Sequence, residues 1–233
     1  MAAMTLRQLS GRAWWYPADP DPAKVRGGVG VIADPDGSTV VDAGQSPAHA
    51  RQVQAAIAEA GLPAARRLVY THHHWDHTWG ACAWDDVEII GHDSGAALLA
   101  NEARRPWSHE YLAEQMKADP LLEPSFSARA AAMDGWDDFT IVPPHTTFSD
   151  SLWVPGGIEV RHVGGQHTVD STIVIDRESS VAFLGDCFYP PPYHLRQPGD
   201  THDVGMIRAL LAENLEWYVD SHSEPRRRSS IAA

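Results

Sequence analysis

The sequence predicts an α/β protein built in layers. Predicted strands come first, helices follow, strands return, and one more helix precedes the C-terminal segment. In the first half, a strand, a helix and a second strand follow one another in the order of a βαβ unit, whose strands are parallel. Two sheets packed face to face with helices outside would accommodate this order.

The first predicted strands form a hairpin. Residues 29–33 and 38–42 are rich in β-branched side chains, and the turn sequence Asp34-Pro35-Asp36-Gly37 separates them. A helix should follow, because Ser46 is a good N-cap and Pro47 suits the first helical position. Gly61 then predicts the end of that helix.

A short apolar strand over residues 67–70 completes the βαβ unit.

Residues 95–135 are predicted to be a mostly helical insertion. Its clearest helix covers 108–117, and Pro120 and Pro124 interrupt the pattern. We expect this insertion to cover the functional site. Further strands are predicted at 158–163, 171–175 and 181–184, and a last helix at 204–217.

Length and composition predict one folded domain that acts on a small molecule. The 233 residues contain no internal repeat and no long linker, so residues 1–233 should form a single domain. Hydrophobic residues make up 43% and charged residues 21%, which is typical of globular proteins. The net charge of −13 would repel nucleic acid and anionic lipid, so the predicted partner is a small-molecule substrate, with no nucleic acid and no membrane. The oligomeric state is left open.

A cytoplasmic location is the default prediction. The chain has no apolar stretch of membrane-spanning length. Its first residues contain Arg7, Gln8 and Arg12, where a signal peptide would need an apolar core.

A cluster of histidines directly after the strand at 67–70 carries the functional prediction. The run Thr71-His72-His73-His74-Trp75-Asp76-His77 contains four imidazoles and a carboxylate, which are suitable ligands for zinc, iron and related divalent ions. His72 and His74 are two residues apart and should point to the same side of an extended segment. Asp76 and His77 could then reach a second ion nearby. His73 should point away and pack or support the ligands.

This cluster resembles the HxHxDH signature of the metallo-β-lactamase superfamily, and the whole run is most similar to that of glyoxalase II-like hydrolases. The resemblance implies a four-layer αββα sandwich. It also implies two divalent metal ions at one edge of the sheets, zinc first, with iron or manganese as alternatives.

Later motifs extend the resemblance over nearly the whole chain. His167, in Gly164-Gly165-Gln166-His167-Thr168, would join His72 and His74 at the first ion. Asp186, in Phe183-Leu184-Gly185-Asp186, would bridge both ions. His222 stands where the family has its last metal histidine, in an altered Asp-Ser-His-Ser sequence. Asp42 resembles the early aspartate of the family, and we expect it to support the ligands.

The ligand set predicted from the run and these motifs is His72, His74, Asp76, His77, His167, Asp186 and His222. Cys187 is adjacent to Asp186 and should point the opposite way, so we expect Asp186 to face the metals. The lysine that β-lactamases carry after their metal-binding cysteine is absent. The glutathione-binding domain of glyoxalase II would not fit in the 11 residues after His222.

The predicted activity is hydrolysis of an ester, thioester, lactone or amide by a metal-activated water, with Asp76 and Asp186 as catalytic residues. Trp75, Tyr193 and His194 are the predicted substrate-binding residues. Two alternatives stay open: a mononuclear iron enzyme similar to the sulfur dioxygenases of the superfamily, and a non-catalytic metal-binding member.

Overall fold

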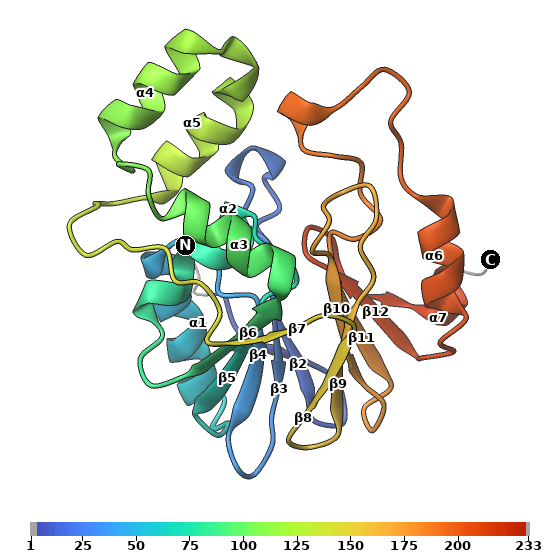
Figure 1. The fold of residues 1–233 in the computed structure, drawn as a ribbon. Helices are drawn as coiled ribbons and strands as arrows, with labels where there is room; N and C mark the ends of the chain where they lie inside the picture. Colours follow the sequence, from blue (N-terminus) through green and yellow to red (C-terminus); the bar gives the residue numbers. More distant parts are fainter. Residues whose placement is uncertain (1–3, 232–233) are drawn as a thin grey trace.

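The protein is a sandwich of two β-sheets with helices on both outer sides (Figure 1). The computed structural model describes residues 4–231, so residues 1–3 and 232–233 of the predicted domain lie outside the described chain. Within that part, the predicted four-layer αββα architecture is confirmed.

The strands of the first sheet lie side by side in chain order. They pair antiparallel from β1 to β4 and parallel from β4 to β7, which confirms both the predicted hairpin and the parallel βαβ unit. Their bounds are β1 (Arg7–Ser10), β2 (Ala13–Tyr16), β3 (Val29–Ile32), β4 (Ser38–Val41), β5 (Ala65–Val69), β6 (Glu88–His92) and β7 (Thr146–Phe148).

The second sheet is formed by the later part of the chain, in the order β13-β12-β11-β10-β9-β8. Only β11 and β12 pair in parallel; the other described neighbours are antiparallel. The bounds are β8 (Ser151–Val154), β9 (Ile158–His162), β10 (Thr172–Asp176), β11 (Val181–Gly185), β12 (Trp217–Asp220) and β13 (Arg226–Arg227).

Helices cover the outer faces and one edge of the sandwich. α1 begins as predicted, because the side chain of Ser46 accepts a hydrogen bond from the backbone of His49 and Pro47 is its first residue. The α-helices are α1 (Pro47–Glu59), α2 (Trp75–Thr78), α3 (Asp93–Glu102), α4 (His109–Ala118), α5 (Glu123–Ala132), α6 (Val204–Leu211) and α7 (Arg228–Ile231). Short 3₁₀ helices are η1 (Pro22–Lys24), η2 (Trp79–Ala83), η3 (Pro120–Leu122) and η4 (Tyr193–Leu195).

Alternating side chains separate the interior into three apolar layers. Leu68 packs outward with α1, whereas its neighbour Val69 packs between the sheets. In the second sheet, Phe183 points between the sheets and Leu184 points outward with α6. Successive strand residues point to opposite faces, so central strands that are covered on both faces are apolar throughout.

The last predicted helix is too long. We predicted a helix over 204–217, but α6 ends at Leu211. Asn214, three residues further on, adopts a positive φ of 56°, which a continuing helix would not allow. Trp217 then pairs with Val181 as the first residue of β12. The competing strand pairing extends the second sheet, and helical spacing in the sequence does not reveal it.

The segment 95–135 contains α4 and α5 and most of α3, and it projects beside the upper edge of the first sheet (Figure 1). None of the helices in residues 4–231 is both long and apolar enough to cross a membrane.

Candidate metal centre

The predicted ligands come from loops at one edge of the sandwich. His72 to His77 follow the end of β5 and enter α2. His167 lies in the loop between β9 and β10. Asp186 and His222 follow the ends of the parallel strands β11 and β12, so they emerge side by side.

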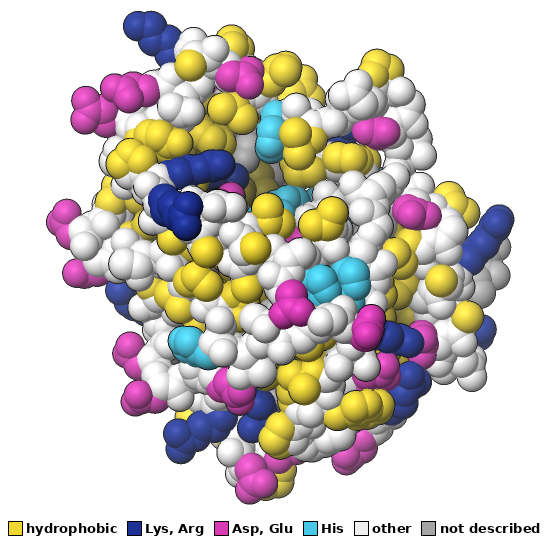
Figure 2. Space-filling view, in the orientation of Figure 1, with side chains coloured by type: hydrophobic (Ala, Val, Ile, Leu, Met, Phe, Trp, Pro, Cys, Tyr) yellow, Lys and Arg dark blue, Asp and Glu magenta, His cyan; other side chains and the backbone are white. Residues whose placement is uncertain are grey.

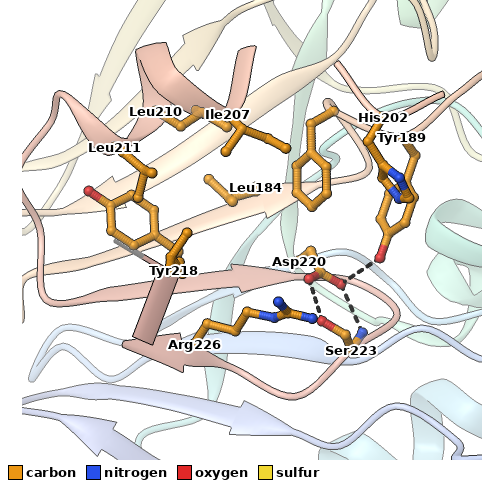
Figure 3. Close-up of a pocket in the computed structure, with 12 residues that line it drawn as sticks. Leu184, Tyr189, His202, Ile207, Leu210, Leu211, Tyr218, Asp220, Ser223 and Arg226 are labelled. Atoms are coloured by element: carbon orange, nitrogen blue, oxygen red, sulfur yellow. Dashed lines mark hydrogen bonds between the residues drawn. The ribbon is translucent and has the colours of Figure 1, made fainter. Parts of the chain in front are cut away.

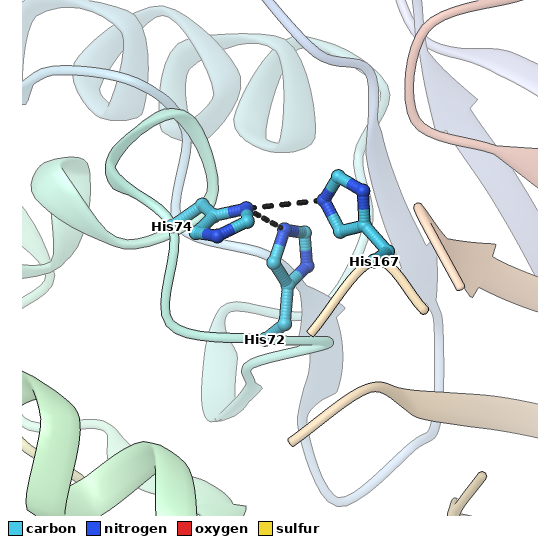
Figure 4. Close-up of side chains that lie close together, drawn as sticks. All are labelled: His72, His74 and His167. Atoms are coloured by element: carbon cyan, nitrogen blue, oxygen red, sulfur yellow. Dashed lines mark hydrogen bonds between the residues drawn. The ribbon is translucent and has the colours of Figure 1, made fainter. Parts of the chain in front are cut away.

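His72, His74 and His167 form the first group of potential ligands. The imidazole nitrogens converge: Nδ1 of His74 lies 2.9 Å from Nε2 of His72 and 3.1 Å from Nε2 of His167 (Figure 4). The three rings are therefore close enough to bind one ion.

The second group consists of Asp76, His77, Asp186 and His222. Nε2 of His77 lies 3.2 Å from Oδ2 of Asp76 and 3.6 Å from Oδ2 of Asp186. Nε2 of His222 lies 3.3 Å from Oδ2 of Asp76 and 3.2 Å from Oδ2 of Asp186. Two imidazoles thus alternate with two carboxylates around one point.

Asp186 joins the two groups. Its Oδ2 atom lies 3.6 Å from Nε2 of His167 in the first group and 3.2 Å from Nε2 of His222 in the second. One carboxylate is therefore within reach of both candidate sites.

Hydrogen bonds on the far side of the rings orient three of the histidines. Nδ1 of His77 donates to Oδ2 of Asp42 at 2.8 Å. Nδ1 of His167 donates to the carbonyl of Pro190 at 2.9 Å, and Nδ1 of His72 lies 3.1 Å from Oγ1 of Thr71. The Thr71 hydroxyl donates to Asp42, so it accepts from His72. In each ring the other nitrogen keeps its lone pair for an ion, as in metal sites generally.

The donor set fits a divalent metal. Zinc binds nitrogen and oxygen at about 2.0–2.1 Å, so the donors of a tetrahedral site lie about 3.3 Å apart. The distances given above, from 2.9 to 3.6 Å, bracket that value. In the described chain, Nε2 of His77 and Oδ1 of Asp186 are also buried without a hydrogen-bond partner. A cation would satisfy these atoms, and the superfamily resemblance predicts one here.

The electrostatics of the two groups differ. Burial lowers the pKa of His72 and His74 well below the usual range, and neighbouring histidines lower it further, so both rings are neutral near pH 7. In the second group burial opposes ionisation of Asp76 and Asp186, yet His77 and His222 outweigh it and lower both carboxyl pKa values. Burial likewise opposes charge on His222, but Asp186 and Asp76 raise its pKa to about 10. The carboxylates thus draw positive charge into the second group, and a divalent ion would supply it.

The neighbours of the ligands lie apart from both groups. His73 points away and its Nδ1 hydrogen-bonds Oδ1 of Asp170 at 2.9 Å. Cys187 is buried in the apolar layer under α6, where burial raises the pKa of its thiol. It is Asp186, and not Cys187, that lies among the histidines.

Hydrogen bonds to the carboxylate of Asp220 stabilise the altered motif around His222. Asp220 accepts hydrogen bonds from the backbone of His222 at 2.9 Å and of Ser223 at 2.8 Å, and from the hydroxyl of Tyr189 at 3.1 Å. Figure 3 shows Asp220, Ser223 and Tyr189 at one end of a cavity of about 360 Å³ between the second sheet and α6. Asp220, the first residue of the altered motif, therefore holds the turn that presents His222.

The predicted substrate-binding residues differ in how far they are exposed. Trp75 is 4% exposed and packs against Trp79 in the core, with ring centroids 5.6 Å apart. Tyr193 is 59% exposed on η4, and its neighbour His194 is half-buried. Trp75 therefore packs in the core, whereas Tyr193 and His194 belong to the short helix η4.

Sequence reasoning missed Arg129, which α5 buries against Trp75 and other aromatic rings. Arg129 is one of 18 Lys and Arg residues, and helical spacing gives no sign that an exposed helix turns it inward. The aromatic residues on separate segments could have suggested a cation site only once their packing was known.

The comparisons with known proteins agree with this geometry. The sequence model of the metallo-beta-lactamase superfamily matches residues 27–206, most of the chain and all of the predicted ligands except His222. The chain belongs to the metallo-β-lactamase superfamily. The predicted family is thus confirmed, whereas its resemblance to glyoxalase II within the superfamily stays a prediction. No curated protein sequence matches the chain significantly.

Solved metallo-β-lactamases share the fold. The enzyme from Erythrobacter litoralis is 18% identical with a TM-score of 0.65, and the alignment covers 100% of this chain and 94% of that one. The enzyme from Pontibacter korlensis is 17% identical with a TM-score of 0.66, over 98% and 95% of the two chains. The enzyme from Hirschia baltica is 17% identical with a TM-score of 0.65, over 98% and 94%. At such identities the likeness shows the fold alone.

Proposed function

We propose that this member of the superfamily is a dinuclear metal-dependent hydrolase. The observation that carries the proposal is the position of Asp186, whose Oδ2 lies within 3.6 Å of His167 in one ligand group and of His77 in the other. A carboxylate in that position can bridge two ions. We propose zinc for both, with iron or manganese as alternatives, because imidazole and carboxylate suit all three.

His72, His74 and His167 would hold one ion, and Asp76, His77 and His222 the other, with Asp186 between them. The ions, when bound, would lower the pKa of a water molecule toward neutrality and polarise the carbonyl oxygen of the substrate.

The protein's own groups would orient the water molecule and the histidine ligands. Asp76 and Asp186 have lowered pKa values, so both are ionised and can orient a water molecule by accepting its hydrogens. Asp42 and the carbonyl of Pro190 hold His77 and His167 in the tautomers that leave Nε2 free. Asp76 and Asp186 are therefore our catalytic assignments.

The substrate we propose is a small ester, thioester, lactone or amide. The net charge of −13 argues against nucleic acid and anionic membranes as partners. Tyr193 and His194 stay predicted substrate contacts, because η4 lies against η3, which connects α4 and α5 in the helical insertion. A cytoplasmic location also stays a prediction.

A metal count combined with an activity panel tests the function. Protein purified without chelator and supplied with zinc, iron or manganese should contain near two ions per chain by elemental analysis. It should hydrolyse at least one member of a chromogenic panel of esters, thioesters, lactones and β-lactams, and lose that activity reversibly on chelation.

Each alternative function gives a different result. A metal content that stays near one ion per chain, with activity in the iron-supplied protein alone, would support the mononuclear sulfur dioxygenase-like enzyme. Two bound ions without any hydrolysis across the panel would support the non-catalytic metal-binding member. Both results contradict the dinuclear hydrolase.

A further inference from the structure

Arg129 is a buried cation surrounded by aromatic rings. It lies on α5 with 7% of its surface exposed. Its Cζ atom is 4.7 Å from the ring centroid of Phe126, 5.2 Å from that of Trp79, 5.3 Å from that of Trp107 and 5.7 Å from that of Trp75. We refer to these four rings as the aromatic box.

The guanidinium group is not satisfied by hydrogen bonds in the described chain. Its Nε and Nη1 atoms are buried and have no partner among residues 4–231. Burial lowers the pKa of Arg129 to about 10, so the group still carries its charge near neutral pH. A buried cation with unpaired N–H groups is costly, and the rings compensate only part of that cost.

The aromatic box leaves N–H donors of Arg129 without acceptors, and a carboxylate is the group that matches them. Aromatic rings attract a guanidinium through its charge, and they accept few of its N–H groups as hydrogen bonds. The five N–H donors lie in one plane and match the two oxygens of a carboxylate. The charge of Glu102 favours the Arg129 cation, but no protein carboxylate forms an ion pair with it in the described chain. A ligand carboxylate could bind the accessible part of the guanidinium, whereas the buried Nε and Nη1 atoms would be reached only if the rings moved.

The aromatic box adjoins the candidate metal centre. Trp75 is a wall of the box and lies in the chain between His74 and Asp76, which belong to the two ligand groups. Burial lowers the pKa of Arg129, and the charges of Glu102 and then Asp76 oppose that effect. Burial also lowers the pKa of His194 on the η4 loop, and the charge of Arg129 adds to that effect. α5, which carries Arg129, contacts η3, and η3 in turn contacts η4.

The surface is open on this side. Figure 2 shows a hollow between the lobe formed by α4 and α5 and the loop that carries η4, with histidine side chains inside it. A small molecule in that hollow would lie against the lobe that contains α5, the helix of Arg129, and near the histidine side chains inside the hollow.

We propose that Arg129 is a specificity-determining residue that binds a carboxylate of the substrate. The substrate class is then a small ester, thioester, lactone or amide that carries a free carboxylate and an apolar spacer. This inference rests on the proposed hydrolase function for the position of the reacting group. One cation in an apolar surround suits a carboxylate better than a phosphate dianion, which needs more donors.

A binding measurement that requires no turnover tests the proposal. Glutarate and its monoamide glutaramate are matched in length, and each has one carboxylate for the metal ions, but only glutarate has a second one for Arg129. Calorimetric titration of the metal-loaded protein should show that glutarate binds about tenfold or more tightly, as expected for a charge-assisted hydrogen bond.

Variants at two arginines locate the preference. Arg129→Met should reduce the ratio of the two dissociation constants to near one with unchanged metal content. Arg129→Lys keeps the charge without the planar donors and should give an intermediate ratio. The matched control is Arg105→Met, because Arg105 also lies over the Trp107 ring, at 5.6 Å, but is exposed. It should keep the wild-type ratio.

Several outcomes would overturn the inference. Equal affinity of the wild-type protein for glutarate and glutaramate does so without any variant. The inference also fails if Arg129→Lys and Arg129→Met both keep the wild-type ratio of the glutarate and glutaramate dissociation constants. It fails likewise if Arg105→Met abolishes the preference for glutarate. If the preference depends on Arg129 while the chromogenic panel shows no hydrolysis, the binding assignment stands and the hydrolase proposal fails.

Discussion

Oδ2 of Asp42 accepts a hydrogen bond from Nδ1 of His77 at 2.8 Å, and the same carboxylate accepts from the backbone and hydroxyl of Thr71. Asp42 follows β4 and Thr71 follows β5, so one buried aspartate joins two parallel strands and orients a ligand of the second group. Asp42 has a positive φ of 69°, a conformation that aspartate and asparagine tolerate better than most residues.

Replacement of Asp42 should therefore weaken metal binding. We expect Asp42→Asn to lower the affinity of the second group by roughly 10–100-fold, the usual effect of removing such a supporting carboxylate. Chelator competition followed by elemental analysis would measure the change. Asp170→Asn is the control, because Asp170 is equally buried and bonded to a histidine, but His73 lies in neither group. Equal loss of metal in both variants would contradict the assignment.

Asp186 and Cys187 should behave oppositely when replaced. Asp186→Ala removes the oxygen that both groups share, so occupancy of the second group and hydrolytic activity should fall together. Cys187→Ser changes a side chain in the apolar layer under α6 and should lower Tm while keeping the metal content. Elemental analysis and thermal unfolding of both variants provide the measurements. Retention of metal in the first variant and its loss in the second would identify a cysteine-containing site instead.

The helical insertion should influence substrate binding more than metal binding. Tyr111 of α4 packs on Trp107 with centroids 5.4 Å apart, and Trp107 packs on Trp79 at 4.9 Å. Trimming Tyr111 to alanine should loosen the aromatic box and raise KM about threefold to tenfold, with a smaller effect on kcat. Leu121→Ala, at a 56% exposed position on η3, serves as the control. A drop in metal content in Tyr111→Ala with unchanged KM would disprove this role.

Arg12 forms an ion pair that connects the two sheets. It lies between β1 and β2 and donates to Asp176 at the end of β10 twice, from Nε at 3.1 Å and from Nη2 at 2.9 Å. Arg12→Met should leave the buried Asp176 without its cation and lower the free energy of unfolding at pH 7 by about 3 kcal/mol. Urea unfolding would measure this loss. Arg7→Met, which removes an exposed partner of Glu224, should have little effect.

The effect of Arg12→Met should also depend on pH. Burial opposes ionisation of Asp176, but the hydrogen bonds from Arg12 outweigh it and lower the carboxyl pKa in the folded state below 3.8. The stabilisation is therefore complete above the unfolded pKa and is lost as pH falls through the folded pKa. The difference between wild type and variant should shrink below about pH 4. A difference that is constant from pH 7 to 3 would contradict this explanation.

Local sequence patterns determined several elements. The turn at 34–37 and the β-branched residues on either side specify the β3–β4 hairpin, and Ser46 and Pro47 specify the start of α1. In these cases the decisive interactions lie within a few residues, so local patterns suffice. Local patterns do not suffice where long-range strand pairing competes with them. For this reason β12 replaces the end of the predicted last helix.

The sequence alone also determined which residues could form the metal centre. His72, His74, Asp76 and His77 are close in the chain, so their proximity follows from local geometry, and motifs of the superfamily marked His167, Asp186 and His222. Only the tertiary structure decided that Asp186 lies between both groups, that Trp75 packs in the core, and that Arg129 is enclosed by four rings. These relationships depend on how α2, α5 and the loops after β9, β11 and β12 pack against one another. Such packing is set by the summed burial of side chains far apart in the chain, which no short window of sequence contains.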